Sequence, residues 1–210
     1  KTSNQYQIEL IGGDTCRGPL SISIQVSGLV DQNNYVNRKG AQLGDLILVT
    51  GELGNAALGL AYLQQRVILP ATLIEPCLEA LNRPSPRLEL TGFLGSYASA
   101  AIDLSDGLVG DLRHILDQSQ KGATIRLDSL PVNDFIRSQQ EYNYALTGGD
   151  DFELCFTIPT QHKDVIDEWN DKNPQCKLTH IGEITDRNYE LVGNHKTENL
   201  NNWQGYQHFE

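Results

Sequence analysis

The pattern of apolar and polar positions predicts a chain in which short strands and helices follow one another. Strict alternation in LSISIQVSGLV predicts a half-buried strand over Leu20–Val30, and apolar runs bounded by turn residues predict five more. The predicted strands are 20–30, 46–50, 99–104, 123–127, 152–158 and 178–184. Helical periodicity predicts helices over 56–67, 71–82, 108–119, 131–139 and 162–170. We therefore expect a mixed α/β layered domain, in which 178–184 is the last element.

Composition and charge describe an acidic globular chain. Of 210 residues, 39% are hydrophobic, and 16 Lys and Arg against 27 Asp and Glu give a net charge of −11. No apolar run approaches the roughly 20 residues that a membrane-spanning helix needs. Binding nucleic acid without regard to sequence requires clustered Lys and Arg. We therefore expect neither a membrane nor a nucleic acid among the partners.

The cysteines indicate the cellular compartment, and the first residue indicates whether the sequence is a complete translation product. Cys16, Cys77, Cys155 and Cys176 are scattered without a CxxC pair. This scatter favours reduced, mostly buried thiols in a cytoplasmic protein over a disulfide framework or a zinc site. The sequence begins with Lys1 and contains no Met, so we expect a fragment, and its first residues lack the pattern of a signal peptide.

Glycine and aspartate recur together at three ends of predicted strands. The motifs are Gly12-Gly13-Asp14-Thr15, Asp103-Leu104-Ser105-Asp106-Gly107 and Gly148-Gly149-Asp150-Asp151. Glycine lets a ligand approach the main chain, carboxylates are ligands that Mg²⁺ prefers, and free N–H groups at a helix N-terminus, as after the second motif, favour phosphate. Each motif alone is also a common turn or helix cap. Their repetition predicts Mg²⁺-dependent phosphate chemistry, without P-loop or GxGxxG spacing.

Three further charged residues lie near these motifs or between helices. Asp111 stands five residues after Asp106 and so does not share its helix face, which predicts a solvated side chain. Arg83 and Arg87 flank two prolines, and we expect both in a solvated linker, with a role at phosphate as the alternative.

Five segments resemble the thiamine-monophosphate kinase family of the aminoimidazole ribonucleotide synthetase-like superfamily. They are GGDTCRGPLSISIQVSG, NRKGAQLGDLILVTGELGNAALGL, AIDLSDGLVGDLRHI, TGGDDFELCFTIP and GYQHF, in the family's order and spacing. The resemblance covers nearly the whole chain and about the last two thirds of the family's length. It implies that residues 1–40 end an N-terminal domain that binds ATP and metal and dimerises. Residues 41–210 would form the C-terminal domain, a layered α/β (α+β) unit with a mixed sheet.

The resemblance also implies an activity. Enzymes of this family phosphorylate thiamine monophosphate to thiamine diphosphate with ATP and several Mg²⁺ ions, by direct in-line transfer, as cytoplasmic homodimers. We expect the 210 residues alone to have little of this activity. The alternatives are another ATP-using enzyme of the superfamily, such as selenophosphate synthetase, and a non-catalytic phosphate-binding module.

Individual site residues follow from the resemblance position by position. The positions that match ATP contacts are Gly13, Asp14, Arg38 and Ser105. The positions that match metal ligands are Asp14, Asp103 and Asp106. Substrate contacts match Asp150, where the family usually has the longer Glu, and Tyr206, with Trp203 as the alternative aromatic ring. No general base is expected, because the acceptor phosphate is already anionic.

Overall fold

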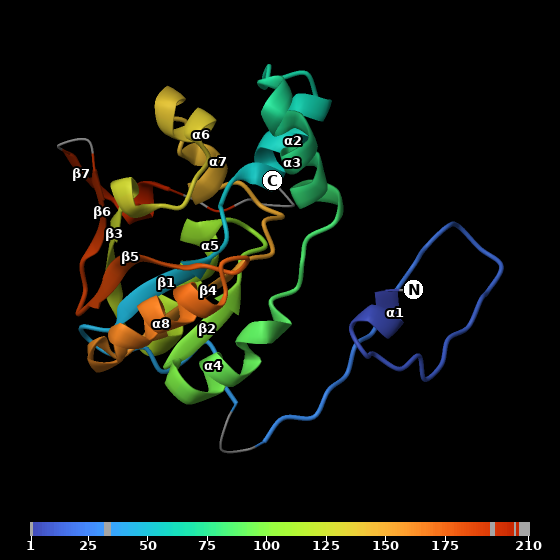
Figure 1. Cartoon of the computed structure of the whole chain (residues 1–210), viewed down its shortest axis with the longest axis horizontal. Coiled ribbons are helices and arrows are strands. Elements are labelled where there is room, and N and C mark those ends of the chain that lie inside the picture. The colour runs from blue at the N-terminus through green and yellow to red at the C-terminus, as the bar shows by residue number, and fades with distance from the viewer. Residues whose placement is uncertain (1, 32–34, 194–195, 204, 206–210) are drawn as a thin grey trace. The chain divides into compact units, whose positions relative to one another are not determined.

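The chain divides into two units, Lys1–Asp31 and Gln32–Glu210, in a computed structural model that describes residues 2–31, 35–193, 196–203 and 205 (Figure 1). Unit 1 contains the helix α1 (Thr2–Gln5), and its residues from 8 to 31 form neither helix nor strand. The strand predicted over Leu20–Val30 is therefore wrong, and Leu20 and Ile24 are 94% and 85% exposed. An alternating segment becomes a strand only when another strand pairs with its backbone, and the described part of the chain supplies none to this segment.

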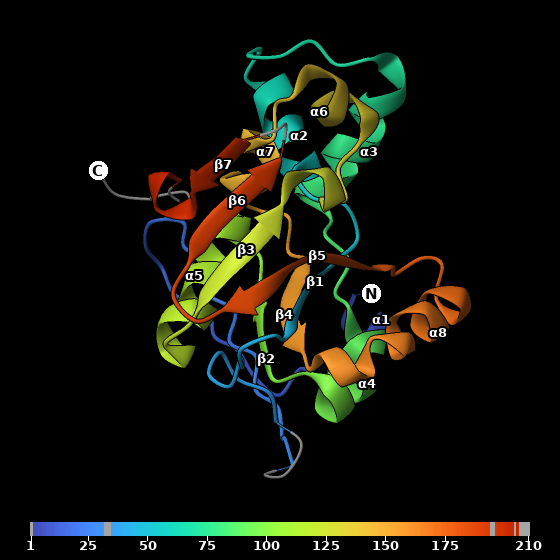
Figure 2. The same ribbon diagram turned by 90° about the vertical axis from the view of Figure 1, so that its left-hand side faces the viewer.

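Unit 2 is built on a mixed sheet of seven strands among the described residues. The strands are β1 (Leu46–Thr50), β2 (Ala100–Asp103), β3 (Gly122–Arg126), β4 (Leu154–Ile158), β5 (Leu178–Thr185), β6 (Tyr189–Gly193) and β7 (Lys196–Asn199). Their order is β2-β4-β1-β5-β3-β6-β7, and β3 with β6 is the parallel pair among the antiparallel neighbours (Figure 2). The prediction that 178–184 ends the fold is wrong, because β6 and β7 follow it. The polar, exposed KTEN of β7 carries no hydrophobic alternation to reveal it.

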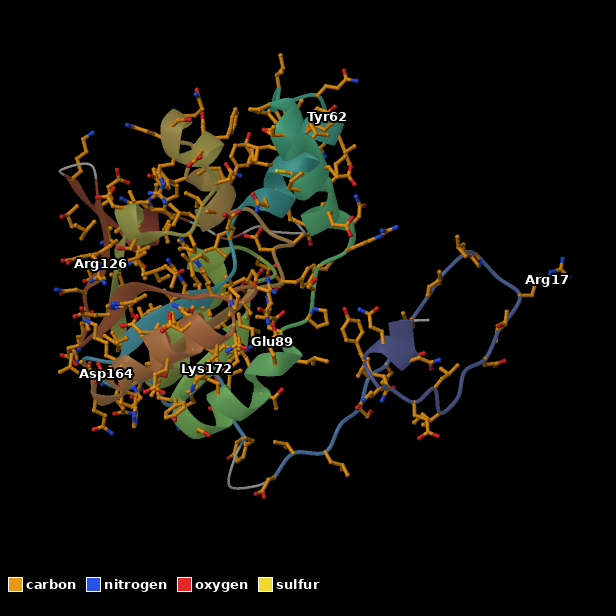
Figure 3. The ribbon with its side chains drawn as sticks, in the orientation of Figure 1. Arg17, Tyr62, Glu89, Arg126, Asp164 and Lys172 are labelled. Carbon is orange, nitrogen blue, oxygen red and sulfur yellow. The ribbon has the colours of Figure 1, made fainter. Side chains whose placement is uncertain are left out.

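The helices of unit 2 include all five that the periodicity predicts. They are α2 (Asn55–Leu63), α3 (Ala71–Asn82), α4 (Thr91–Tyr97), α5 (Leu108–Ser119), α6 (Asp134–Gln139), α7 (Asn143–Leu146) and α8 (Asp164–Lys172). The short helices α4 and α7 are not predicted. In α8, Asp164 lies in the first turn and Lys172 in the last, which complements the helix dipole (Figure 3). None of the helices formed by the described residues is long and apolar enough to cross a membrane.

Both faces of the sheet are covered, which accounts for the continuous apolar run of β1. Ile47 and Val49 pack into a core that includes the inner face of α5. Leu46 and Leu48 pack into a second core, on the opposite face, with residues of α4 and α8. The remaining helices α2, α3, α6 and α7 gather at one end of the sheet (Figures 1 and 2). This arrangement leaves the loops after β1 and β2 and the loop before β4 between the sheet and that helical end.

The cysteines behave as predicted. All four are free, and Cys77, Cys155 and Cys176 are buried while Cys16 is exposed. Burial, helped by the charge of Glu52, raises the pKa of the Cys77 thiol to about 11. A thiol with this pKa stays protonated and unreactive at neutral pH.

Candidate active site

The turn between β2 and α5 carries the first group of candidate residues. It runs from Asp103, the last residue of β2, to Leu108, where α5 begins, and it leaves Asp103 exposed and Ser105 and Asp106 half-buried. Gly107 has φ 97°, and a Cβ there would lie 2.8 Å from the carbonyl carbon of Thr147. Glycine is therefore needed both for the backbone conformation and for the close approach of a neighbouring loop.

The carboxylate of Asp111 holds this turn from inside the protein. Its Oδ2 accepts the Ser105 N–H at 2.8 Å and the Asp106 N–H at 2.9 Å, and the residue is 3% exposed. Burial raises the pKa of Asp111, the two N–H donors oppose this shift, and the charges of Asp106 and Asp103 add to it. The prediction of a solvated Asp111 is wrong.

Helix geometry explains why the spacing argument failed for Asp111. The argument placed Asp106 within the helix, but α5 begins two residues later at Leu108, so Asp111 lies in its first turn. Side chains there lean back toward the helix N-terminus, which brings this carboxylate to the preceding turn. Counting from Gly107 as the helix cap would have revealed it. The Ser105 and Asp106 amides, expected to be free for phosphate, are occupied by the protein's own anion.

The loop Gly148–Asp150 packs directly on the Ser105–Asp106 turn. The Asp150 N–H donates to the Ser105 carbonyl at 2.9 Å, and the Phe152 N–H donates to the Leu104 carbonyl at 2.8 Å. The Leu104 N–H in turn donates to the Glu153 carbonyl at 2.8 Å. A Cβ on Gly149 would lie only 2.5 Å from the Ser105 carbonyl oxygen, so glycine at this position allows the loop to pack closely on the turn. Two of the three Gly–Asp motifs thus form one site.

A pocket of about 470 Å³ opens beside the two joined motifs. The pocket is lined by Ser105 and residues 147–150, together with Leu60, Tyr144 and the charged residues Arg66 and Glu141 among others. Asp150 is exposed and has φ 68°, a left-handed conformation that aspartate tolerates better than most residues. The pocket therefore combines a carboxylate with apolar and aromatic surface.

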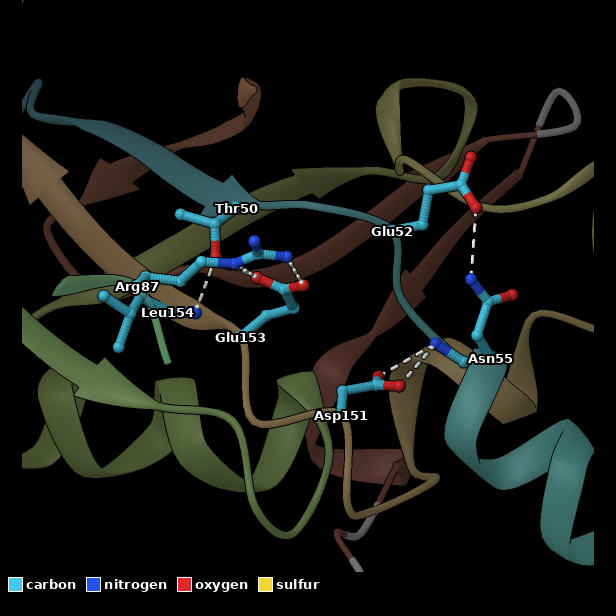
Figure 4. Close-up of polar contacts among 8 residues, drawn as sticks. Thr50, Glu52, Asn55, Arg87, Asp151, Glu153 and Leu154 are labelled. Carbon is cyan, nitrogen blue, oxygen red and sulfur yellow. Dashed lines mark hydrogen bonds and ion pairs between the residues drawn. The ribbon is translucent and has the colours of Figure 1, made fainter. Parts of the chain in front are cut away.

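The adjacent Asp151 points to the N-terminus of α2 (Figure 4). Its Oδ1 and Oδ2 accept the Gly54 N–H at 3.0 and 2.8 Å, at the N-terminus of α2. Burial raises the pKa of Asp151 to about 7, against the opposing effect of the Gly54 and Ala56 N–H groups. Asp151 thus caps α2, whose own cap residue, Gly54, has no side chain for the purpose.

Glu153 forms a buried ion pair that the sequence did not reveal (Figure 4). The Arg87 Nε donates to Glu153 Oε2 at 2.7 Å, the Arg87 Nη2 pairs with Oε1, and the Thr50 hydroxyl also donates to Oε2. The hydrogen bond to Glu153 raises the pKa of Arg87, although burial opposes this. The prediction that Arg87 is solvated is wrong, whereas Arg83 is exposed. The signal in the sequence was Glu153 itself, in Phe152-Glu153-Leu154: a glutamate directly before a buried strand indicates a buried charge that needs a cationic partner.

The remaining predicted site residues belong to other segments of the chain. Gly13 and Asp14 lie in unit 1, where an Asp14 carboxylate oxygen accepts the Thr15 N–H at 2.7 Å. Arg38 is exposed in unit 2, next to Asn37, whose carbonyl accepts the Ala101 N–H at 3.0 Å. Tyr206 lies outside the described residues. Trp203 packs against the larger core, and its Nε1 donates to Glu198 at 3.2 Å.

Asp103 and Asp106 are the predicted metal ligands that unit 2 supplies. Over 2–31, 35–193, 196–203 and 205, no three His, Cys, Asp or Glu side chains gather into a metal-binding group. Across those same ranges every buried side-chain N or O atom has a hydrogen-bond partner. The site is therefore a fully bonded scaffold with two carboxylates at its turn.

Comparison with known proteins gives a consistent picture along the sequence. The family model for AIR synthase related protein, C-terminal domain, matches residues 42–193. The thiamine-monophosphate kinase of Haemophilus influenzae is 40% identical over 221 aligned residues, which cover 99% of this chain and 66% of that protein. The chain thus spans slightly less than two thirds of the length of this relative. The resemblance predicted from the five motif segments is confirmed.

Solved structures share the fold. The crystal structure of thiamine-monophosphate kinase from Stenotrophomonas maltophilia K279a has a TM-score of 0.69 and 37% identity, over 75% of this chain and 52% of that one. The structure of AaThiL complexed with AMPPCP and TMP has a TM-score of 0.64 and 29% identity, over 83% of this chain and 54% of that one. These likenesses confirm the layered α/β fold with a mixed sheet.

Proposed function

Because the chain belongs to the AIR synthase related family and matches a thiamine-monophosphate kinase over nearly all of its length, we propose that the protein phosphorylates thiamine monophosphate to thiamine diphosphate with ATP. One observation carries the proposal. The Ser105–Asp106 turn and the Gly148–Asp150 loop are bonded to each other beside a pocket of about 470 Å³. The turn that we assign to ATP and the loop that carries the Asp150 carboxylate, which we assign to the substrate, are therefore held together by backbone hydrogen bonds.

The nucleotide side of the site consists of Ser105 as an ATP contact and Asp103 and Asp106 as ligands of Mg²⁺. Mg²⁺ usually takes one or two carboxylates together with substrate phosphates and water, so two carboxylates at one turn suit it. The metal supplies charge neutralisation that lets two polyanions approach each other. By the family resemblance, Gly13, Asp14 and Arg38 match further ATP contacts, and Asp14 also matches a metal ligand.

The substrate side consists of Asp150 and, outside the described residues, Tyr206. An exposed carboxylate at the pocket attracts the cationic thiazolium of thiamine monophosphate. An aromatic ring stacks against the same cation. Asp150 is one methylene shorter than the glutamate that the family usually has at this position, so its carboxylate keeps the charge but reaches less far from the loop backbone.

The reaction asks little covalent chemistry of the protein. The acceptor oxygen of a phosphate monoester is already anionic at neutral pH, so no residue has to remove a proton from it. The residues of the two motifs bind and orient the reactants for direct in-line transfer of the phosphoryl group. We include no general base in this mechanism.

The organisation of the protein follows the same family reasoning. Residues 1–40 end an N-terminal domain that forms a homodimer, and 41–210 form the C-terminal domain. The exposed alternating side chains of Leu20, Ile22 and Ile24 in unit 1 support this, because such a segment gains most from a pairing partner. The free cysteines support a cytoplasmic location.

The test is formation of thiamine diphosphate from thiamine monophosphate, ATP and Mg²⁺ by a full-length version of the protein, with the 210-residue chain assayed in parallel. We expect product from the full-length protein and little from the chain alone, since the matched region covers 66% of the relative and about a third of that protein lies outside it. Robust turnover by the 210 residues would contradict the second expectation. No product from either folded protein would favour another ATP-using enzyme of the superfamily or a non-catalytic phosphate-binding module.

A further inference from the structure

We propose that Asp111 is a positioning residue of the site: its buried carboxylate fixes the backbone of Ser105 and Asp106 in the conformation that binds Mg²⁺–ATP. The inference rests on the proposed function for its ligand. Asp111 itself touches neither reactant in this scheme.

The geometry around one oxygen atom carries the inference. Asp111 Oδ2 accepts two consecutive backbone N–H groups, those of Ser105 at 2.8 Å and Asp106 at 2.9 Å. Hydrogen bonds to an ionised acceptor are about twice as strong as neutral ones, and here they form where the acceptor is 3% exposed. Two successive peptide groups are thereby held in one orientation relative to α5.

This anchoring determines which groups the turn offers to a ligand. Because the Ser105 and Asp106 amides are bonded to Asp111, they do not bind a phosphate in this conformation. The side chains of Ser105, which lines the pocket, and of Asp106, which the proposed function assigns to Mg²⁺, are left to contact the ligand, and both residues are half-buried. Without Asp111 the two amides would lose their acceptor, and the backbone that positions both side chains would be less fixed.

Backbone amide hydrogen exchange tests the anchoring without reference to activity. We compare Asp111→Ala and Asp111→Asn, with Asp117→Ala as the matched control, because Asp117 lies on the same helix and is exposed. We expect exchange at the Ser105 and Asp106 amides to become about tenfold faster in Asp111→Ala. Asp111→Asn, which keeps an acceptor oxygen without the charge, should change less, and Asp117→Ala should match the wild type. Unchanged exchange at both amides in Asp111→Ala would overturn the inference.

Calorimetric titration of the full-length protein with Mg²⁺–ATP separates positioning from simple destabilisation. We expect the Kd to rise about tenfold in Asp111→Ala and less in Asp111→Asn, with the stoichiometry retained. A lowered stoichiometry with an unchanged Kd would mean that Asp111 only maintains the fold, and would overturn positioning. If Asp111→Ala does not fold, Asp111→Asn decides: faster exchange and weaker binding support the inference, and wild-type values overturn it.

The two proposals fail in different ways. If the wild-type protein binds Mg²⁺–ATP but makes no thiamine diphosphate, the proposed substrate is wrong. The role of Asp111 is then still decided by amide exchange and Mg²⁺–ATP binding in the Asp111 variants. A wild-type protein that does not bind Mg²⁺–ATP overturns the role of Asp111 as well.

Discussion

At the scale of single residues, Asp150 and Asp151 show how one peptide bond can separate two uses of the same side chain. Asp150 is exposed at the pocket, while Asp151 is turned to the α2 N-terminus and accepts the Gly54 N–H. Burial raises the pKa of Asp151 from its ordinary value of 3.8 to about 7. The folded protein therefore holds a proton on Asp151 at pH values where the unfolded chain has released it.

This difference makes stability depend on pH through Asp151. Between about pH 4 and 7 the folded state binds more protons than the unfolded state, so the free energy of unfolding falls as pH rises and then levels off. We expect the wild type to lose roughly 2–4 kcal/mol through this group, and Asp151→Asn to lack that loss. Urea unfolding at pH 4.5, 6 and 7.5 measures it, with Asp150→Asn as the control that keeps the α2 cap. An identical pH profile in Asp151→Asn and wild type would contradict the prediction.

Residues such as Asp111 and Glu153 mark the limit of what the sequence predicts at this scale. Ser105, Asp106 and Asp150 were predicted as site residues because glycine next to a strand end indicates a turn. The buried carboxylates of Asp111 and Glu153 were not predicted, since their burial depends on where α5 begins and on which loop packs against them. Spacing along a chain does not contain that information.

At the scale of elements, the Arg87–Glu153 ion pair ties the segment after α3 to the entry of β4. The two side chains are 15% and 11% exposed, and the Thr50 hydroxyl at the end of β1 also donates to the same carboxylate. The pair therefore joins three segments that lie far apart in the sequence. Removing one partner would leave a buried charge behind.

We expect Arg87→Ala to lower the free energy of unfolding by about 3 kcal/mol, because the Glu153 carboxylate stays buried without its cation. Arg83→Ala is the matched control four residues earlier. The Arg83 side chain is 76% exposed, and its Nη1 lies 3.8 Å from Glu79 Oε1. An exposed pair of this kind contributes roughly 0–1 kcal/mol. Chemical denaturation of both variants measures the difference, and equal losses would show that burial is not what matters.

Elements differed in how well their pattern could be read. β1 and α3 were predicted with the bounds that the structure has, since their apolar positions alone decide where they pack. The predictions failed for β7 and for Leu20–Val30, for opposite reasons. The edge strand β7 pairs with β6 although it has no apolar pattern. The segment Leu20–Val30 has the alternating pattern, but its side chains are exposed and the described residues give it no partner strand. Strand formation depends on pairing, which a single segment does not specify.

At the scale of the whole molecule, the two units differ in how their backbone is bonded. Residues 8–31 of unit 1 form neither helix nor strand and are exposed throughout, whereas unit 2 has two packed cores. Arg17 is an exposed residue in that segment (Figure 3). Arg113 lies within α5 and is half-buried. A protease should therefore distinguish the two sites.

We expect trypsin to cut after Arg17 at least about tenfold faster than after Arg113, because cleavage within a packed helix requires local unfolding first. Mass spectrometry of the early fragments of the 210-residue chain checks the order. The control is the chain in urea above its unfolding midpoint, where both sites should be cut at similar rates. Early cleavage after Arg113 in the folded chain would contradict the described packing of α5.

The three bonds that join the Leu104–Ser105 segment to the Asp150–Glu153 segment run entirely between main-chain groups. Such bonds do not depend on the side chains beside them, so substituting the side chain of Ser105 or Asp150 leaves all three bonds in place. The side chains at the turn and the loop can therefore change one at a time while the backbone that carries them keeps its conformation.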